Sequence, residues 1–160
     1  MIAKPTEVHI ESIAAGGDGV ARADGLVVLT PRTAPGDVVE VDVTMEKRLG
    51  RGRLVRIVSP GPDRVEPQCA HYVEDRCGGC QLQHMAYDAQ RAAKAGIIRD
   101  ALVRLGRRPL DAPPPVRPSD QQWRYRRKLT LAMERHGTRW IAGLFPYDDP
   151  RHPFVLTDCP

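Results

Sequence analysis

The sequence predicts a mainly β protein with one helix, an α+β chain whose strands come first. Short apolar or alternating segments separated by turn formers fill residues 5–58, which is typical of strands. Residues 84–106 instead carry apolar side chains at helical spacing. A length of 160 residues is enough for one ordinary domain or two small ones.

The first part of the chain predicts a small closed barrel. Its expected strands are residues 8–14, 27–32, 37–44 and 51–59. The clearest alternation places Val39, Val41 and Val43 on one face of a strand. Residues 16–25 are rich in turn formers, and Pro60-Gly61-Pro62 is expected to end the unit.

The remaining sequence predicts four further segments. We expect a barrel over residues 1–60, a cysteine loop over 61–83, a helix over 84–106, a proline-rich linker over 107–120 and the beginning of a β-rich domain over 121–160. Residues 123–133 alternate with period two, which predicts a strand with Trp123 and Tyr125 on the core-facing side. Residues 139–145 are its expected hairpin partner, and a short strand follows near the end.

The positive charge is concentrated rather than dispersed. The net charge is +4, but residues 1–46 carry 3 basic and 8 acidic side chains, and residues 47–58 carry 5 basic side chains without an acid. Residues 107–160 contribute a second positive block. Such clusters are typical either of a polyanion-binding surface or of a solvated face, and the composition leaves both open.

The sequence shows no targeting or membrane signal. No stretch approaches the roughly 20 apolar residues that span a bilayer, so no membrane association is expected. The first residues lack the basic start and apolar run of a signal peptide. We therefore expect a cytoplasmic protein, where thiols stay reduced and clustered cysteines bind metal more often than they form disulfides.

Four cysteines form the most specific pattern in the chain. Cys69, Cys77 and Cys80 have the spacing C-x7-C-x2-C, and Cys159 stands next to the final residue. Four thiolates can bind zinc or an iron–sulfur cluster. The single close pair with one distant Cys-Pro favours the cluster over zinc, and four unrelated buried cysteines are the third possibility.

Residues around the cysteines add two details. Gly78 and Gly79 leave the backbone between the close pair free to bend and let amide groups approach sulfur. His71 and His84 flank the motif and could replace a thiolate in a zinc site. Such histidines are more often local hydrogen-bonding residues.

Several segments together resemble one known family. These are "CGGCQLQH" at 77–84, "DCP" at 158–160, "GGDGVAR" at 16–22, "TPRTAPGDVVEV" at 30–41, "GRGRLVRI" at 50–57 and "WRYRRKLTLAM" at 123–133. The chain resembles the N-terminal part of bacterial RNA (uracil-C5)-methyltransferases, with an OB-like TRAM barrel, an iron–sulfur loop and the start of a central RNA-binding domain. The family commonly has five residues between its first two cysteines, whereas this chain has seven.

The resemblance implies a cofactor and a reaction. It implies a structural [4Fe–4S] cluster held by Cys69, Cys77, Cys80 and Cys159. The full-length family uses S-adenosylmethionine, bound by a Rossmann-like domain, with a cysteine nucleophile and a carboxylate base. We find none of these catalytic elements in residues 1–160, so we expect this part alone to be inactive and to contain no catalytic residue.

The resemblance also implies an RNA partner, with 23S ribosomal RNA as the expected target. The expected RNA-binding residues are Lys47, Arg48, Arg51, Arg53, Arg124, Arg126 and Lys128. The alternative is a stand-alone RNA-binding module, made of a TRAM barrel and a metal knuckle, that performs no chemistry. A monomer is the default expectation.

Overall fold

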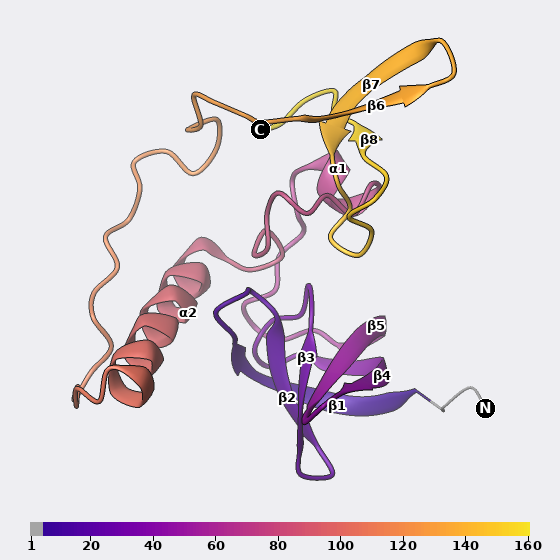
Figure 1. Cartoon of the computed structure of the whole chain (residues 1–160). Helices are drawn as coiled ribbons and strands as arrows, with labels where there is room; N and C mark the ends of the chain where they lie inside the picture. Colours follow the sequence, from indigo (N-terminus) through magenta and orange to yellow (C-terminus); the bar gives the residue numbers. More distant parts are fainter. Residues whose placement is uncertain (1–4) are drawn as a thin grey trace. The chain divides into compact units, whose positions relative to one another are not determined.

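A computed structural model describes residues 5–160 and divides the chain into two compact units (Figure 1). The first unit contains the residues up to 66 together with residues 84–117, and the second contains residues 67–83 and 118–160. No helix within the described residues is both long and apolar enough to cross a membrane. Each unit is described by itself below.

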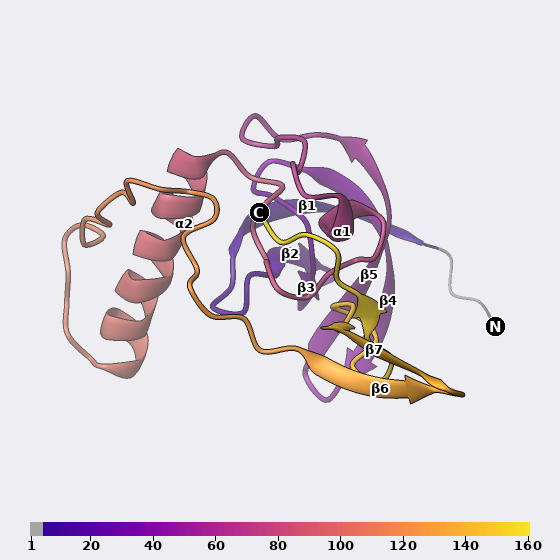
Figure 2. The same cartoon turned by 90° about the horizontal axis from the view of Figure 1, so that it is seen from above.

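Five strands of the first unit close into a barrel with the order β1-β2-β3-β5-β4 (Figure 1 and Figure 2). They are β1 (Thr6–Ile13), β2 (Gly19–Ala23), β3 (Leu26–Thr30), β4 (Val38–Glu46) and β5 (Leu49–Ser59). The β3–β5 pair is parallel and the other pairs are antiparallel. The predicted barrel is therefore confirmed. Strand β2 was not expected, because turn formers dominate the residues on either side of it.

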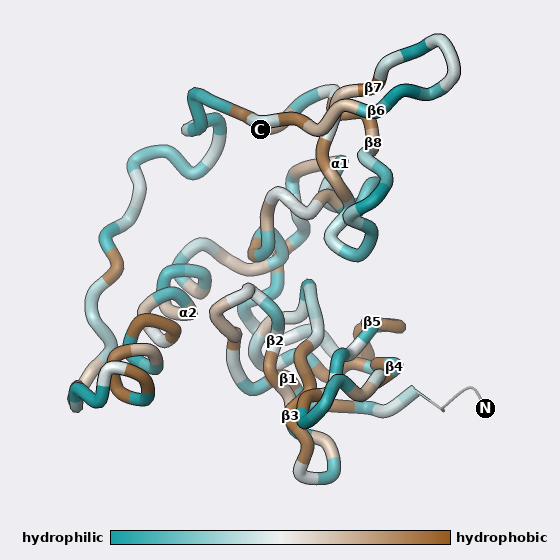
Figure 3. Tube along the Cα trace, in the orientation of Figure 1, coloured by the Kyte–Doolittle hydropathy of each residue, from teal (hydrophilic) through white to brown (hydrophobic). Residues whose placement is uncertain are grey.

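The barrel interior is filled by small and branched side chains from alternating positions. Val8, Ile10, Ala21, Val39 and Val41 form one buried cluster, and Figure 3 shows the apolar stretches along these strands. The predicted inward face of β4 is confirmed, since Val39 and Val41 are fully buried. Burial of such side chains is the main stabilising contribution to a small barrel.

Strand β5 crosses close to β3, and this approach requires a residue without a side chain. A Cβ atom on Gly52 would lie 2.2 Å from the Thr30 hydroxyl oxygen and 3.1 Å from a methyl group of Val28. Because a substituted side chain would force these strands apart, Gly52 allows the short parallel contact that closes the barrel.

One end of the barrel is held by a buried ion pair. The Asp37 side chain is fully buried, and its two oxygens accept hydrogen bonds from the amides of Ala34 at 2.6 Å and Gly61 at 2.8 Å. The Arg64 guanidinium also donates to Asp37, with its Nε 3.0 Å from Oδ1. Burial alone would raise the pKa of Asp37, but the hydrogen bonds from Arg64 and the two amides lower it below 3.8.

The predicted helix of the first unit is confirmed with shorter bounds. Helix α2 spans Tyr87–Asp100 and continues as a π-helical segment, η1 (Ala101–Leu105), to Gly106. The helix begins after residue 86 because His84 and Met85 are buried and Arg64 pairs with Met85 in an isolated bridge. The proline-rich linker is extended, and Arg91 of α2 donates to the carbonyl of Val116 at 2.9 Å.

The second unit contains a short helix and a small antiparallel sheet. Its elements are α1 (Ala70–Val73), β6 (Ala132–His136), β7 (Arg139–Leu144) and β8 (Phe154–Val155), with sheet order β6-β7-β8. The predicted hairpin and closing strand are confirmed, and Gly137 in the hairpin turn has a φ of 60°.

The predicted strand over residues 123–133 is wrong for most of its length. Strand β6 begins only at Ala132, and Arg124 has a φ of 52°, which no strand accommodates. Trp123 is half-buried, but Tyr125 is 57% exposed, so the expected core packing of Tyr125 is also wrong. Period-two alternation does not make a strand when no neighbouring strand pairs with the segment.

Candidate functional site

All four predicted ligand cysteines belong to the second unit. Cys69 immediately precedes α1, Cys77 and Cys80 follow that helix, and Cys159 comes from the other end of the unit's sequence. All four are free thiols; Cys69 and Cys77 are buried, whereas Cys80 and Cys159 are exposed. The fold therefore brings cysteines that lie far apart in the sequence into one compact unit.

The loop that carries Cys77 is hydrogen-bonded to the segment after β7. The Gly78 amide donates to the carbonyl of Phe145 at 2.9 Å, and the Tyr147 amide donates to the carbonyl of Arg76 at 2.9 Å. A Cβ atom on Gly78 would lie 3.1 Å from that same Phe145 oxygen. The lack of a side chain at Gly78 allows this close approach of two backbones, a role that differs from the predicted freedom to bend.

His71 connects the two sequence segments of this unit a second time. Its Nε2 accepts a hydrogen bond from the Thr157 amide at 3.1 Å and lies 2.9 Å from the Thr157 hydroxyl oxygen. Since Nε2 accepts, the proton is on Nδ1, which donates to the Asp75 carboxylate at 2.6 Å. Both ring nitrogens are engaged, so His71 is a structural hydrogen-bonding residue next to Cys69.

The four thiols influence one another electrostatically. Burial raises the pKa of the Cys77 thiol above 9.0, and the proximity of Cys80, Cys69 and Cys159 raises it further. The pKa of Cys159 is also raised, first by burial and then by Cys80 and Cys69. The Gly79 amide donates to the Cys77 sulfur at 3.4 Å, a contact that stabilises a thiolate.

The donor set fits an iron–sulfur cluster in number and chemistry. Four free thiols in one unit match the Cys₄ ligation of such clusters, and hydrogen bonds from amides to ligand sulfurs, like the one from Gly79, are known to tune them. Within residues 5–160, no three His, Cys, Asp or Glu side chains are gathered closely enough to hold a single metal ion. His84 belongs to the first unit, whereas the four cysteines belong to the second.

Two of the four predicted cations of the barrel are paired with acidic side chains. Arg51 forms ion pairs with Asp18 and Glu46, each at 3.2 Å, and Arg53 pairs with Asp42. The Arg53 contact follows from the register, which places Asp42 opposite Arg53. The basic block of β5 is thus matched in space by the acidic first part of the chain.

Within the described part of the barrel, the predicted cations without an acidic partner lie in the turn between β4 and β5. Lys47 and Arg48 occupy this turn, and among the described residues neither forms an ion pair. Lys47 has a φ of 59°, as a tight turn requires. These two side chains are therefore the barrel residues best placed to contact an external anion.

The predicted cations near residue 124 have different surroundings from one another. Arg124 pairs with Asp158 at 2.7 Å, so it anchors the residue before Cys159. The Arg126 guanidinium lies 5.9 Å from the centre of the Tyr125 ring, and Lys128 is exposed. Because the segment is not a strand, alternation does not place these three residues on one strand face, and their contact with RNA stays a prediction.

The family of the barrel follows from its sequence as well as its shape. Residues 3–55 match the TRAM domain family and cover the five barrel strands except the end of β5. The chain carries a TRAM domain. The predicted OB-like barrel and its predicted family are both confirmed.

Similar proteins bear names from RNA modification. The chain is 37% identical over 153 residues to an uncharacterized RNA methyltransferase of Halalkalibacterium halodurans, an alignment covering 95% of this chain and 32% of that protein. It is 39% identical over 142 residues to a 23S rRNA (uracil(1939)-C(5))-methyltransferase RlmD of Methylococcus capsulatus, covering 88% and 30% of the two chains. The RlmD of Shewanella sediminis is 38% identical over 117 residues, covering 72% and 26%.

These relatives confirm the predicted resemblance to RNA (uracil-C5)-methyltransferases. The chain spans about a third of the length of the curated relatives it matches.

Two groups that matter to the site were not predicted from the sequence. The buried Asp37–Arg64 ion pair of the first unit joins residues far apart in the chain, and no local pattern indicates it. The role of His71 had a partial signal, since Asp75 stands four positions later on the same side of a helical turn. Its second partner, Thr157, becomes visible only in the folded unit.

Proposed function

We propose that this chain is the RNA-recruiting and iron–sulfur part of an S-adenosylmethionine-dependent RNA (uracil-C5)-methyltransferase that acts on 23S ribosomal RNA in the cytoplasm. The single observation that carries the proposal is the order of two parts along the chain: a TRAM domain comes first, and the residues with four free thiols follow it. The resemblance implies the same order for that family. The names of the RlmD relatives support the choice of ribosomal RNA.

In this proposal Cys69, Cys77, Cys80 and Cys159 hold a [4Fe–4S] cluster. When bound, the cluster supplies iron–thiolate bonds that join residues 67–83 to the end of the second unit. Gly79 donates its amide to the Cys77 sulfur, and His71 holds the backbone at Thr157 two residues before Cys159. These residues orient the thiols, and the role of the cluster is structural.

The TRAM domain contributes RNA affinity rather than chemistry. Lys47 and Arg48 are unpaired cations in an exposed turn, and loops of OB-like barrels commonly contact oligonucleotides. The methyl donor and the catalytic nucleophile belong to a part of the enzyme outside this chain. We therefore expect no methyl transfer when this chain alone is incubated with ribosomal RNA and S-adenosylmethionine, and detection of methylated uridine would contradict this.

Anaerobic purification tests the cluster directly. We expect brown protein that contains iron and acid-labile sulfide in equal amounts, and Cys77→Ser should lose both. Gly96→Ala is a suitable control because a Cβ atom at this position meets no atom within 4 Å. Colourless protein with one zinc ion per chain would contradict the cluster, and metal-free folded protein would contradict any metal site.

A further inference from the structure

The segment before β6 has the side-chain pattern of a strand but no strand beside it. Leu129, Leu131 and Met133 occupy alternate positions, and they are 37%, 39% and 66% exposed. Within the described residues, the backbone of residues 128–131 forms no hydrogen bond with another segment. Strand β6, which continues this segment, is the edge of its sheet. The second unit therefore has an open edge that begins before β6 and carries exposed apolar side chains.

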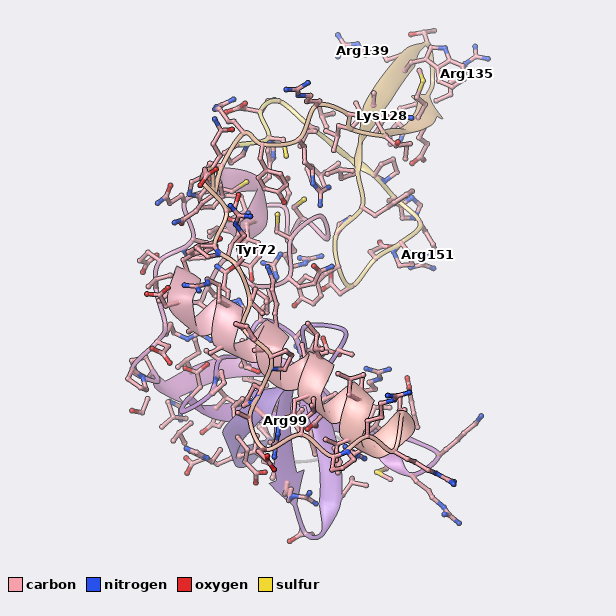
Figure 4. The ribbon with its side chains drawn as sticks, turned by 90° about the vertical axis from the view of Figure 1, so that its left-hand side faces the viewer. Tyr72, Arg99, Lys128, Arg135, Arg139 and Arg151 are labelled. Carbon is pink, nitrogen blue, oxygen red and sulfur yellow. The ribbon has the colours of Figure 1, made fainter. Side chains whose placement is uncertain are left out.

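An open edge of this kind can pair with another strand. The free N–H and C=O groups of an edge accept a second strand readily, and proteins commonly protect such edges with charged residues or proline. Figure 4 places Lys128 where the chain runs into β6 and Arg135 near the far end of that strand. Between these two cations, residues 129–133 contain no charged side chain and no proline. The middle of the edge thus lacks both kinds of protection.

The edge is complementary to a second copy of itself. We consider two copies paired as antiparallel strands, with a two-fold axis through Thr130 and perpendicular to the sheet. Leu129 of each copy then lies directly opposite Leu131 of the other, on the same face. The same register places Arg126 of each copy opposite Glu134 of the other. One register therefore matches apolar with apolar side chains and opposite charges with each other.

Neighbouring registers match less well. An axis one position closer to the C-terminus places Lys128 opposite Glu134. It also places Arg127 opposite Arg135, and like charges directly opposite each other are destabilising. An axis one position closer to the N-terminus places Arg124 opposite Glu134, although Arg124 already pairs with an acid of its own chain at 2.7 Å. Charge complementarity therefore favours the axis through residue 130.

The two charged groups of this register remain available in the single chain. Arg126 lies 5.9 Å from the centre of the Tyr125 ring and pairs with no acid in the described part of the chain. Glu134 contacts His136 and His152 through Oε1, and its buried Oε2 has no donor among the described residues. An acceptor without a donor costs free energy, which an arginine from a second copy would recover.

We propose that two copies of this chain associate through residues 126–134, paired as antiparallel strands with Thr130 at the two-fold axis and Arg126 of each copy bound to Glu134 of the other. The inference goes beyond the proposed function, because it requires no nucleic acid. The shared edge is short, so the dimer is weak and its population depends on protein concentration.

Sedimentation velocity of the anaerobically purified chain with reductant, at several concentrations, measures association without a contribution from disulfides. We expect a concentration-dependent equilibrium between monomer and dimer. Leu129→Lys should abolish the dimer, because it places a charge opposite Leu131 of the other copy. Leu105→Lys is the matched control, since Leu105 is an 84% exposed leucine of the first unit, and it should leave the association unchanged.

A charge swap tests the register. Arg126→Glu should weaken dimerisation about tenfold, because two attractive cross-strand pairs become repulsive. Glu134→Arg should weaken it similarly, and the double variant should recover the affinity of the parent chain, which a role confined to one chain does not explain. Lys128→Glu is the control with the same change in charge, and its effect should be much smaller because Lys128 faces Ala132 in this register.

The outcomes separate this dimer from the proposed function. A chain that stays monomeric at every concentration overturns the dimer, as does a dimer that survives Leu129→Lys or a charge swap without recovery. Loss of the dimer in Leu105→Lys alone would assign the contact to the first unit and would also overturn the proposal. Association that requires added single-stranded RNA would assign the edge to RNA, with the same consequence. If the chain dimerises but binds no RNA, the proposed function alone fails.

Discussion

The barrel packs Val8, Ile10, Ala21, Val39 and Val41 against one another, whereas the second unit contributes only Cys69, Tyr72 and Cys77 to the buried hydrophobic residues described. Two of those three are predicted cluster ligands. Units with so little apolar core commonly need a metal or covalent link to stay folded. We therefore predict that packing stabilises the TRAM domain and that the second unit depends on its thiols for stability.

The two units also differ in how their cations are used. On the barrel, Arg51 and Arg53 face acids across the sheet, so most of the positive block adds little external field. On the β6–β7 hairpin, Arg135 and Arg139 have no acidic partner among the described residues. The same residue type therefore holds strands together in one unit and remains available for a polyanion in the other.

The largest expected effect is a loss of barrel stability when its buried ion pair is broken. Asp37→Asn should lower the free energy of unfolding of the TRAM domain by about 3–5 kcal/mol, because it leaves the largely buried Arg64 without its counter-charge. Urea unfolding followed through the methyl signals of Val39 and Val41 measures this. Asp42→Asn is the control and should cost less than about 1 kcal/mol, because its partner Arg53 is exposed. Equal costs for the two variants would refute the role of the buried pair.

The next effect is a pH dependence specific to the barrel unit. Burial lowers the pKa of His84 from 6.5 to about 4. The unfolded chain therefore binds more protons than the folded one between these values, so stability present above pH 6.5 falls as the pH drops toward 4. The loss amounts to roughly 3 kcal/mol.

The same methyl signals, followed in urea at several pH values, measure this loss. His84→Gln should flatten the curve across that window while the Asp37 contribution, lost only below pH 3.8, remains. A curve of unchanged slope in His84→Gln would assign the pH dependence to another group.

The smallest effect separates paired from unpaired cations. Lys47→Ala with Arg48→Ala should reduce the slope of log affinity for single-stranded RNA against log salt by about 1.4. Arg51→Ala with Arg53→Ala should reduce it much less, because these cations already face acids. Affinities measured by fluorescence anisotropy between low and moderate salt decide the matter. An equal reduction in both variants would show that the ion pairs of β5 open when RNA binds.

Sequence reasoning was most successful where local pattern and fold agree. Alternation in β4 predicted the inward positions of Val39 and Val41, because the inward face of a closed barrel is buried along the whole strand. Alternation over residues 123–131 predicted a strand wrongly, since no neighbouring strand pairs with that segment. Strand β2 was missed because its pairing with β1 and β3, rather than its own propensity, makes it a strand.

The sequence predicted which residues make up the candidate site, but not the hydrogen bonds and ion pairs that hold the surrounding structure. The cysteine spacing, with the family resemblance, predicted one ligand set of four thiols, and the structure places all four in one unit. Nothing local to Asp37 pointed to Arg64, and nothing local to His71 pointed to Thr157, because these contacts arise between segments distant in the sequence. Ion pairing of Arg51 and Arg53 was likewise invisible until the register of β4 and β5 was known.

Hydrogen exchange of the anaerobically purified chain, before and after removal of iron with a chelator, tests the central claim most directly. We predict that amides of residues 67–83 and 118–160 lose protection when iron is removed, while those of β1 to β5 remain protected. Unchanged protection in the second unit, or equal loss in both units, would contradict the dependence of that unit on its four thiols.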